Sequence, residues 1–299
     1  MVKDKVIMDP TTQALKRKRI KSKVGKILAL SFVYLVLILM YAPLLYVTVY
    51  SFTDSTVTGV WTNFSFKTYI TLFNISENVK AQAIWTAAGN TVLVAVVSGL
   101  IATILGTLGA IGIYYTRKKW WKNSLEFINQ IPVVNAEIVT AVSLCILFVF
   151  IKRLTGIERS FITLVIGHVV LGIPYVVMSV EPKLEQMDPS LYEAALDLGA
   201  TQTQALTKIV IPDILPGILS GFMLSVTLSL DDYVITSFTK PGGFNTISTY
   251  VDEAMKKGGL PIQLRAFTAL LFGIILIALI VATIKSRINS KKNEIKKEI

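Results

Sequence analysis

The stretch LYEAALDLGATQTQALTKIVIP, residues 191–212, is polar and helical in pattern although long apolar segments lie on both sides of it. Its first helix is predicted to begin at Ser190, whose spacing to Glu193 fits a capping box, or at Asp188 just upstream. One face of that helix repeats at i, i+3, i+4 and i+7 and consists of Leu191, Ala194, Ala195 and Leu198. This pattern indicates a short helix outside the lipid.

Gly199 follows this helix at the position where a residue most often takes a positive φ. Thr201 and Gln204 have the spacing to cap a second short helix, which we expect to stop at Pro212. The stretch from about residue 188 to residue 212 therefore predicts a helix–glycine–helix elbow.

The segments on either side of the elbow are apolar enough to cross a membrane. The chain of 299 residues is 53% hydrophobic and only 16% charged, with a mean hydropathy of +0.61. A helix needs about 20 apolar residues to cross a hydrocarbon core about 30 Å thick. The segments that reach this length are 27–50, 86–115, 127–151, 160–180, 213–236 and 262–284. The sequence therefore predicts an all-α membrane protein, with six transmembrane helices in one domain over residues 27–284.

Lys and Arg residues set the expected orientation of these helices. The segments 1–26, 116–122, 181–212 and 285–299 carry 21 of them, whereas the loops on the opposite side carry eight. Because cytoplasmic loops are enriched in these residues, we expect both termini and the elbow to be cytoplasmic. Residues 1–26 and 285–299 are then basic cytoplasmic tails, and the first has the composition to attract anionic lipid.

The composition also excludes several classes of protein. The formal net charge of +11 suggests nucleic acid as a partner, but the apolar content argues against it. Cys145 is the only cysteine, which excludes a disulfide framework. The sequence has no zinc-type spacing and no G-x4-G-K-[ST] motif, so we predict no metal site, no ATP site and no catalytic residue on this chain.

The fifth predicted span ends in GFMLSVTLSLDDYVITSF, residues 221–238. Small and polar residues at spacings of four, four and three form one narrow stripe, which consists of Gly221, Ser225, Ser229 and Asp232. Asp231 points roughly 100° away from Asp232. Carboxylates at membrane depth indicate an ion or substrate path. The alternative is an interfacial pair that only ends the helix.

Two acidic residues of the elbow, Glu193 and Asp197, are four residues apart. As like charges they destabilise an isolated helix by about 0.2–0.5 kcal/mol. A basic or strongly hydrogen-bonding partner surface would reverse that sign. The alternative is an acidic face that is only solvated.

The elbow resembles the EAA motif of permease subunits in ABC importers. The matching residues run Glu193-Ala194-Ala195-x3-Gly199-x9-Ile209-x-Ile211-Pro212. In that family the motif forms the coupling helix, which inserts into a cleft of the ATPase subunit. The resemblance implies a coupling role for Glu193, Ala194, Ala195, Asp197, Gly199 and Pro212. Ile211 replaces the leucine usual in the family, a swap of similar volume that should matter little.

Most of the chain further resembles the PotC-type permeases of spermidine/putrescine importers. The resembling segments are YAPLLYVTVYSF (41–52), AEIVTAVSLCILF (136–148), GHVVLGIPYVVMSVEPKL (167–184) and SLDDYVITSF (229–238). The family commonly has proline before the acidic residue of the third span, where this chain has Ala136 before Glu137. Pro132 offers a kink one turn earlier.

This resemblance implies a fold, a location and a set of partners. The fold is that of type I (MetI-like) ABC importer permeases, the location is the bacterial cell membrane, and transport follows alternating access. The implied partners are a second permease of similar fold, a dimer of ATPase subunits that binds ATP and Mg²⁺, an external polyamine-binding protein and membrane lipid. No cofactor is expected on this chain.

The chemistry of polyamines agrees with the carboxylates in the predicted spans. A path for an extended polycation requires spaced carboxylates and apolar or aromatic walls, and ring faces add cation–π attraction. The predicted path consists of Glu137, Ser225, Ser229, Asp231, Asp232 and Tyr233. Because Asp232 shares the polar stripe, we expect it to line the path more directly than Asp231.

Two further residues within the spans are polar. His168 lies in mid-helix near Pro174 and is expected to pack and hydrogen-bond, with a proton-relay or substrate role as the alternative. Arg265 is expected to reach the outer surface or to pair with an aspartate.

Three other functions stay open at this point. An ABC permease for another solute would keep the elbow and make the aspartates structural. An ion-coupled secondary carrier would transport without ATP and without partner chains. A membrane scaffold without transport would tolerate alanine at Asp231 and Asp232.

Overall fold

The computed structural model describes residues 10–55, 57, 59–257 and 259–297, with side chains for most residues between 25 and 285. The first nine residues, and the side chains of most of both basic tails, lie outside this description. The described backbone is helical apart from its loops, and its one β feature is an isolated bridge between Thr53 and Phe64. The prediction of an all-α protein is confirmed.

Six helical segments are long and apolar enough to cross a membrane, as predicted. They are Leu28–Tyr50, Val79–Tyr114, Glu137–Thr155, Phe161–Gln186, Gln202–Asp231 and Ile262–Lys285. The chain divides into two compact units, one formed by residues 1–78 with 261–299 and the other by residues 79–260.

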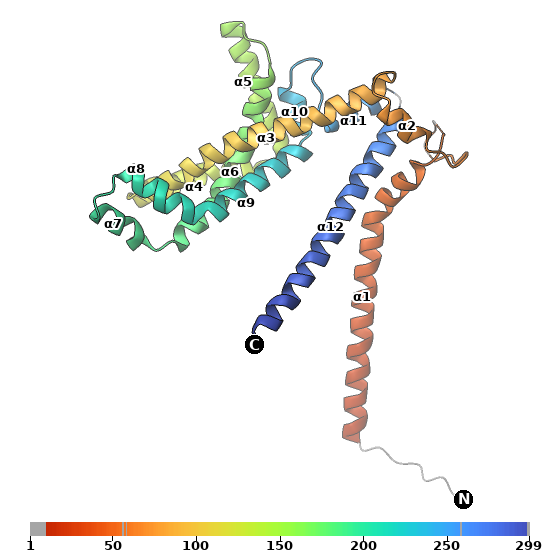
Figure 1. Cartoon of the computed structure of the whole chain (residues 1–299), viewed down its shortest axis with the longest axis horizontal. Helices are drawn as coiled ribbons and strands as arrows, with labels where there is room; N and C mark the ends of the chain where they lie inside the picture. Colours follow the sequence, from red (N-terminus) through yellow and green to blue (C-terminus); the bar gives the residue numbers. More distant parts are fainter. Residues whose placement is uncertain (1–9, 56, 58, 258, 298–299) are drawn as a thin grey trace, which may run out of the picture. The chain divides into compact units, whose positions relative to one another are not determined.

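The first unit contains α1 (Pro10–Tyr50), α2 (Lys67–Phe73) and α12 (Ile262–Lys297), and α12 contacts both other helices (Figure 1). Arg265 of α12 is buried, and its Nη1 donates a hydrogen bond to the Ser55 carbonyl at 3.1 Å. The expectation that Arg265 reaches the outer surface was therefore wrong, because a loop carbonyl of the same unit accepts from its guanidinium.

The second unit is built on three helices that pack against one another: α3 (Val79–Tyr114), α6 (Phe161–Gln186) and α9 (Ile211–Asp231). Their backbones approach closely where glycine replaces a side chain. A Cβ on Gly172 of α6 would lie 2.2 Å from the Ser225 hydroxyl of α9 and 3.0 Å from Cβ of Ala102 of α3. This three-helix contact therefore requires glycine at residue 172.

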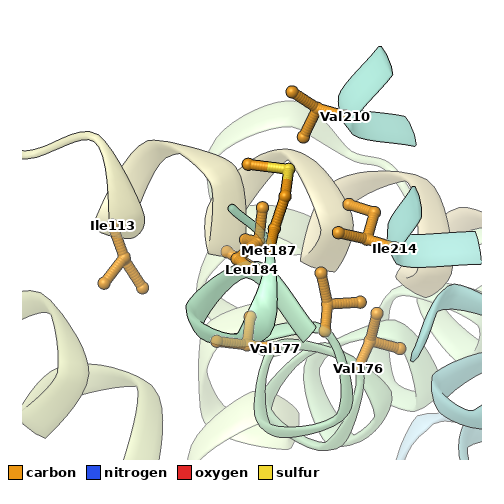
Figure 2. Close-up of a cluster of buried hydrophobic side chains, with 9 residues drawn as sticks. Ile113, Val176, Val177, Leu184, Met187, Val210 and Ile214 are labelled. Atoms are coloured by element: carbon orange, nitrogen blue, oxygen red, sulfur yellow. The ribbon is translucent and has the colours of Figure 1, made fainter. Parts of the chain in front are cut away.

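A buried apolar cluster joins the ends of these three helices to the elbow (Figure 2). Its members are Ala110, Ile113, Val176, Val177, Val180, Leu184, Met187, Val210 and Ile214. Met187 and Val210 lie close to either end of the elbow, so the cluster anchors both of its ends to the helices that cross the membrane.

Two of the predicted spans are interrupted. The apolar segment 127–151 is split between α4 (Lys119–Val134) and α5 (Glu137–Thr155), with an extended backbone at Asn135 and Ala136. Pro132 lacks the N–H that would close the last turn of α4, which weakens the helix just before the break. The predicted span 127–151 was therefore wrong in its start and in its continuity.

The second interruption follows α9, which ends at Asp231. Asp232 is extended, and a new short helix, α10 (Val234–Thr239), begins two residues later. The predicted segment 213–236 ran past this break, whereas the alternative interpretation of Asp231 and Asp232 as a pair that ends the helix placed the end of α9 correctly. Helix α10 packs against α5 and α6, and α11 (Ile247–Lys256) packs against α3.

Candidate functional site

The two helix breaks meet at one cavity of about 380 Å³. Residues of the α4–α5 break form one side, residues around the α9–α10 break form another, and two residues of α6 complete it. The lining residues are Pro132, Val133, Asn135, Glu137, Thr140, Leu171, Tyr175, Thr227, Leu228, Asp231, Asp232, Tyr233, Val234 and Ile235. Irregular backbone at membrane depth is tolerated where it lines a cavity, and discontinuous helices often bear the sites of transporters.

Two exposed carboxylates face this cavity from opposite breaks. Glu137 occupies the first turn of α5, and Asp231 is the last residue of α9. Asp231 and Asp232 both act electrostatically on Glu137. Among the described residues, no Lys or Arg lines the cavity or forms an ion pair with Glu137 or Asp231. The described lining of the cavity therefore gathers carboxyl groups without a Lys or Arg beside them.

Asp232 has a different environment, because its side chain has no exposed area. Its Oδ2 accepts from the Thr236 hydroxyl at 2.6 Å and from the Thr236 N–H at 2.7 Å, and its Oδ1 accepts from the Ile235 N–H at 3.1 Å. These are the bonds of a carboxylate that caps the first turn of a helix. Contrary to our expectation, Asp232 is therefore less accessible from the cavity than Asp231, since capping α10 turns its carboxylate into the protein.

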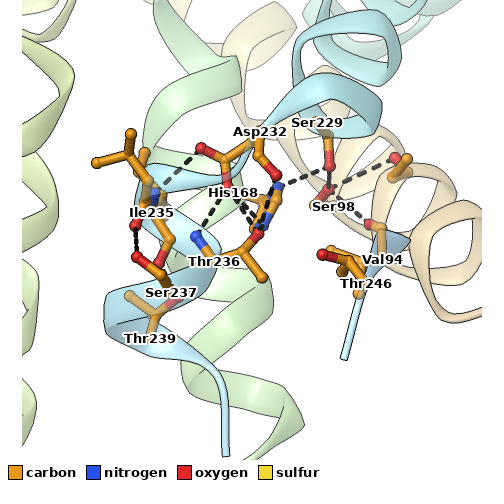
Figure 3. A network of polar contacts seen from close by, with 12 residues as sticks. Val94, Ser98, His168, Ser229, Asp232, Ile235, Thr236, Ser237, Thr239 and Thr246 are labelled. Carbon is orange, nitrogen blue, oxygen red and sulfur yellow. Dashed lines mark hydrogen bonds and ion pairs between the residues drawn. The ribbon is translucent and has the colours of Figure 1, made fainter. Parts of the chain in front are cut away.

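His168 of α6 joins this cap in a buried network (Figure 3). Its Nε2 lies 3.0 Å from the Thr236 hydroxyl and 3.5 Å from Oδ2 of Asp232. Its Nδ1 lies 2.7 Å from the Ser229 hydroxyl, which in turn lies 3.3 Å from the Ser98 hydroxyl of α3. Both ring nitrogens are therefore hydrogen-bonded, as the packing interpretation of His168 predicted.

The two serines of the predicted path lie away from the cavity. Ser225 and Ser229 are buried in the contact of α9 with α3 and α6, and the lining residues on that part of α9 are Thr227 and Leu228. Small residues at four-residue spacing mark a helix contact, and in this chain the contact is with protein. The Ser225 hydroxyl has no hydrogen-bond partner.

Sequence reasoning also missed part of the lining. Tyr175 and Thr140 face the cavity from α6 and α5, and no motif had singled them out. The one available signal for Tyr175 was its position directly after Pro174, inside a predicted span.

A second cavity of about 490 Å³ shares Tyr233 and Val234 with the first, so these residues form the wall between them. Its carboxylates are paired: Lys240 Nζ lies 2.8 Å from Glu253 Oε1, and Lys256 Nζ lies 2.7 Å from Asp252 Oδ2. Hydrogen bonds from these lysines lower the pKa values of Glu253 and Asp252. The two cavities thus differ in charge balance although they share two lining residues.

The elbow begins with α7 (Pro189–Asp197), which Asp188 caps by accepting from the Ser190 N–H at 3.0 Å. Asp188 rather than Ser190 is thus the cap, and this hydrogen bond lowers the pKa of Asp188. Gly199 has φ +85°, and the Ala200 N–H donates to the Ala195 carbonyl at 3.0 Å. The predicted left-handed turn is therefore present.

The second helix of the elbow continues further than predicted. Helix α8 (Gln202–Ala205), capped by Thr201 and Gln204, leads through a π-helical turn at Leu206–Val210 directly into α9. Pro212 directly follows this π-helical turn and the helix continues through it, so the expectation that the second helix stops at Pro212 was wrong.

Most residues assigned to coupling are exposed. Glu193, Ala194, Asp197 and Gly199 lie at the surface, and Ala195 is buried. Leu198 is 89% exposed at the tip of the elbow. An exposed leucine beside two unpaired carboxylates on a capped helix is suited to insertion into a partner protein. Within the described part of the chain, no group of three His, Cys, Asp or Glu side chains is placed to hold a metal ion.

Comparisons with known proteins identify relatives of this chain. Residues 102–292, more than half of the chain, match the family described as "Binding-protein-dependent transport system inner membrane component". The chain is 33% identical over 249 residues to the putrescine transport system permease protein PotI of Escherichia coli K12, which covers 83% of this chain and 84% of PotI. It is 30% identical over 270 residues to the spermidine/putrescine transport system permease protein PotC of the same strain, which covers 90% of this chain and 98% of PotC.

A solved structure has the same fold. A bacterial ABC transporter involved in the import of the acidic polysaccharide alginate matches 90% of this chain and 96% of its own chain, with a TM-score of 0.64 and 17% identity. At that identity the likeness concerns the fold alone.

Proposed function

This chain belongs to the family of binding-protein-dependent transport system inner membrane components, the permease subunits of ABC importers, and on that basis we propose that it carries linear polyamines such as putrescine and spermidine. It is a multi-pass membrane protein. In our proposal the substrate passes the cavity between the two helix breaks, where Glu137 and Asp231 contact its ammonium groups and Tyr233 and Tyr175 contact its methylene chain.

The unbalanced charge of the cavity is the observation that carries this proposal. Two exposed carboxylates and a buried third converge there, and none of the described lining residues is Lys or Arg. An anion such as phosphate would need cationic donors, whereas an alkyl diammonium ion needs carboxylates and ring faces. Relatives named for putrescine and spermidine transport support the same choice.

The elbow supports a mechanism in which another chain supplies the energy. ATP and Mg²⁺ bind to a separate ATPase dimer, and ATP-driven closure of that dimer moves α7 and, through α8, the continuous helix into α9. Because α9 ends at Asp231 beside the cavity, a displacement of the elbow reaches the carboxylates along one continuous run of helix. The chain itself binds no cofactor and catalyses no reaction in this scheme.

The remaining partners follow from the same scheme. A second permease of similar fold completes the translocation path, and an external binding protein delivers the polyamine. Both termini, the 116–122 loop and the elbow lie on the cytoplasmic side, since the segments on that side together carry 21 Lys and Arg residues against eight in the opposite loops.

The test is polyamine uptake by cells that lack their own uptake systems and express the complete transporter. In the Glu137→Gln/Asp231→Asn variant we expect the half-saturating putrescine concentration to rise roughly 5- to 150-fold, the range for losing a charged hydrogen bond worth about 1–3 kcal/mol. Ser225→Ala is the matched control, because Ser225 lies on the same helix outside the cavity.

An unchanged half-saturation and maximal rate in the double variant, with normal surface expression, would leave an ABC permease for another solute as the better assignment. The purified complex provides a second measurement, since the polyamine that stimulates ATP hydrolysis most strongly is the preferred substrate.

A further inference from the structure

The hydrogen bonds around Asp232 run in one direction. The Thr236 hydroxyl has one proton and donates it to Asp232 at 2.6 Å, so it can only accept from Nε2–H of His168. With Nε2 protonated, Nδ1 of the neutral ring accepts from the Ser229 hydroxyl at 2.7 Å. The chain of donors therefore begins on α9, passes through α6 and ends at the carboxylate that caps α10 (Figure 3).

This network lies beside a close contact between α6 and α10. A Cβ on Gly167 would lie 2.8 Å from Cγ2 of Ile235 and 3.2 Å from Cγ2 of Thr239, so glycine at residue 167 lets α10 lie directly on α6. His168 follows that glycine in the sequence and is fully buried, with both ring nitrogens hydrogen-bonded. Its position relative to α10 is thus fixed by packing as well as by hydrogen bonds.

The cap supplies acceptors for the backbone at the break between α9 and α10. Asp232 has φ −65° and ψ 130°, and Tyr233 follows it before α10 begins. Without an acceptor for the Ile235 and Thr236 N–H groups, the segment lowers its free energy by continuing α9 as a regular helix. Continuation would rotate Tyr233 out of the wall between the two cavities.

We propose that His168 is a positioning residue: through Thr236 it holds the Asp232 carboxylate on the first turn of α10 and thereby keeps Tyr233 in the wall between the two cavities. The functional part of this inference rests on the proposed polyamine path, in which Tyr233 contacts the substrate. The geometric part, that the network sets the position of Tyr233, stands independently of the substrate.

The central comparison uses two isosteric substitutions on α10 in the complete transporter. Thr236→Val keeps the shape of the side chain and removes the link between His168 and Asp232. Thr239→Val removes an equally buried hydroxyl that bonds only to the Ile235 carbonyl of its own helix, at 2.7 Å. We expect Thr236→Val to raise the half-saturating putrescine concentration about tenfold, as for one hydrogen bond to a charged group. Thr239→Val and Thr236→Ser should stay close to the unchanged protein.

Two polar substitutions at His168 keep the proposal testable if Thr236→Val fails to fold. Glutamine places an amide N–H near the position of Nε2, whereas asparagine reaches only the position of Nδ1. His168→Gln should therefore preserve half-saturation, and His168→Asn should raise it as Thr236→Val does. In each variant the maximal rate per inserted complex should change by less than about twofold, which separates a binding effect from general damage.

Thiol labelling tests the geometry without any substrate. In a Cys145→Ala background, a water-soluble cationic thiol reagent should modify Tyr233→Cys several-fold more slowly once Thr236→Val is added, and Thr236→Ser should not slow it. Unchanged labelling in both Thr236→Val and His168→Asn would overturn the positioning role. Slower labelling together with polyamine uptake that is insensitive to Glu137→Gln/Asp231→Asn would support the positioning role and overturn the proposed substrate.

Discussion

The elbow at residues 188–212 and the break at Asp232 and Tyr233 both separate two helices, yet their hydrogen bonds span very different distances along the chain. In the elbow, Ala200 donates to Ala195, and Thr201 exchanges bonds with Gln204. At the break, Asp232 accepts from Ile235 and Thr236, three and four residues away, but His168 bonds to Ser229 and Thr236, which lie 61 and 68 residues away.

The two regions also differ in what they leave exposed. The elbow presents Leu198 and two carboxylates to a partner, whereas the break buries Asp232 and leaves only Asp231 and Tyr233 accessible. Because the hydrogen bonds that shape the elbow join residues close in the sequence, the elbow is suited to move as a unit. A break held by long-range bonds changes shape only when the surrounding helices move.

The largest expected effect comes from the turn of the elbow. At Gly199, φ is +85° and a Cβ would meet no atom within 4 Å, so any cost of substitution arises from the backbone alone. Gly199→Val should reduce uptake to background, because a β-branched residue in the left-handed region costs more than the typical value of about 1–2 kcal/mol. Gly199→Asn should retain uptake, since asparagine tolerates this region. Equal uptake by both variants, at equal insertion, would contradict a specific role of the turn.

The second prediction concerns the cap of the break. Asp232→Ala leaves two N–H groups and the Thr236 hydroxyl without their acceptor. Because each buried unsatisfied group costs about 1–3 kcal/mol, the thermal midpoint of the purified complex should fall by several degrees. Asp232→Asn keeps an acceptor oxygen and should fall less. An Asp231→Asn midpoint as low as that of Asp232→Ala would contradict the division between a structural and an accessible carboxylate.

The separation of hydrogen-bonded residues along the chain explains how much of the structure the sequence could predict. The PotC-type and EAA resemblances predicted an ABC importer permease of six spans, and both the family and the fold are confirmed. Local patterns also predicted the left-handed turn at Gly199 and the capping pair of Thr201 and Gln204.

The errors arose where tertiary contacts decide the outcome. The polar stripe of Ser225, Ser229 and Asp232 was recognised, but the sequence could not distinguish a water-filled path from a tight contact with α6. That distinction depends on Gly172, which lies more than 50 residues away and lets α6 approach Ser225. The coupling and path roles of individual residues stay predictions.

We expect a smaller difference in stability between the alanine variants of two serines in the same stripe. Ser229→Ala leaves Nδ1 of a buried histidine without its donor, which should cost about 1 kcal/mol or somewhat more. Ser225→Ala removes a hydroxyl that has no partner and should leave stability unchanged or slightly raised. Thermal unfolding of the two purified variants side by side measures the difference. Equal shifts would show that the network through His168 contributes nothing specific.

The smallest effect on the subunit itself is expected at the tip of the elbow. Leu198 is 89% exposed, so Leu198→Ala removes almost no buried apolar area and should leave the insertion and stability of the subunit unchanged. The same leucine would be buried once the elbow enters a cleft of the ATPase. Loss of its larger side chain at that contact should weaken co-purification of the ATPase and slow uptake by roughly 5- to 10-fold, the range for about 1–1.5 kcal/mol of lost apolar contact.

Leu215→Ala is a suitable control, because Leu215 is also exposed but lies on α9 within a predicted membrane span. Normal ATPase recovery and uptake with Leu198→Ala would mean that coupling uses the backbone and the acidic residues of the elbow without its exposed leucine.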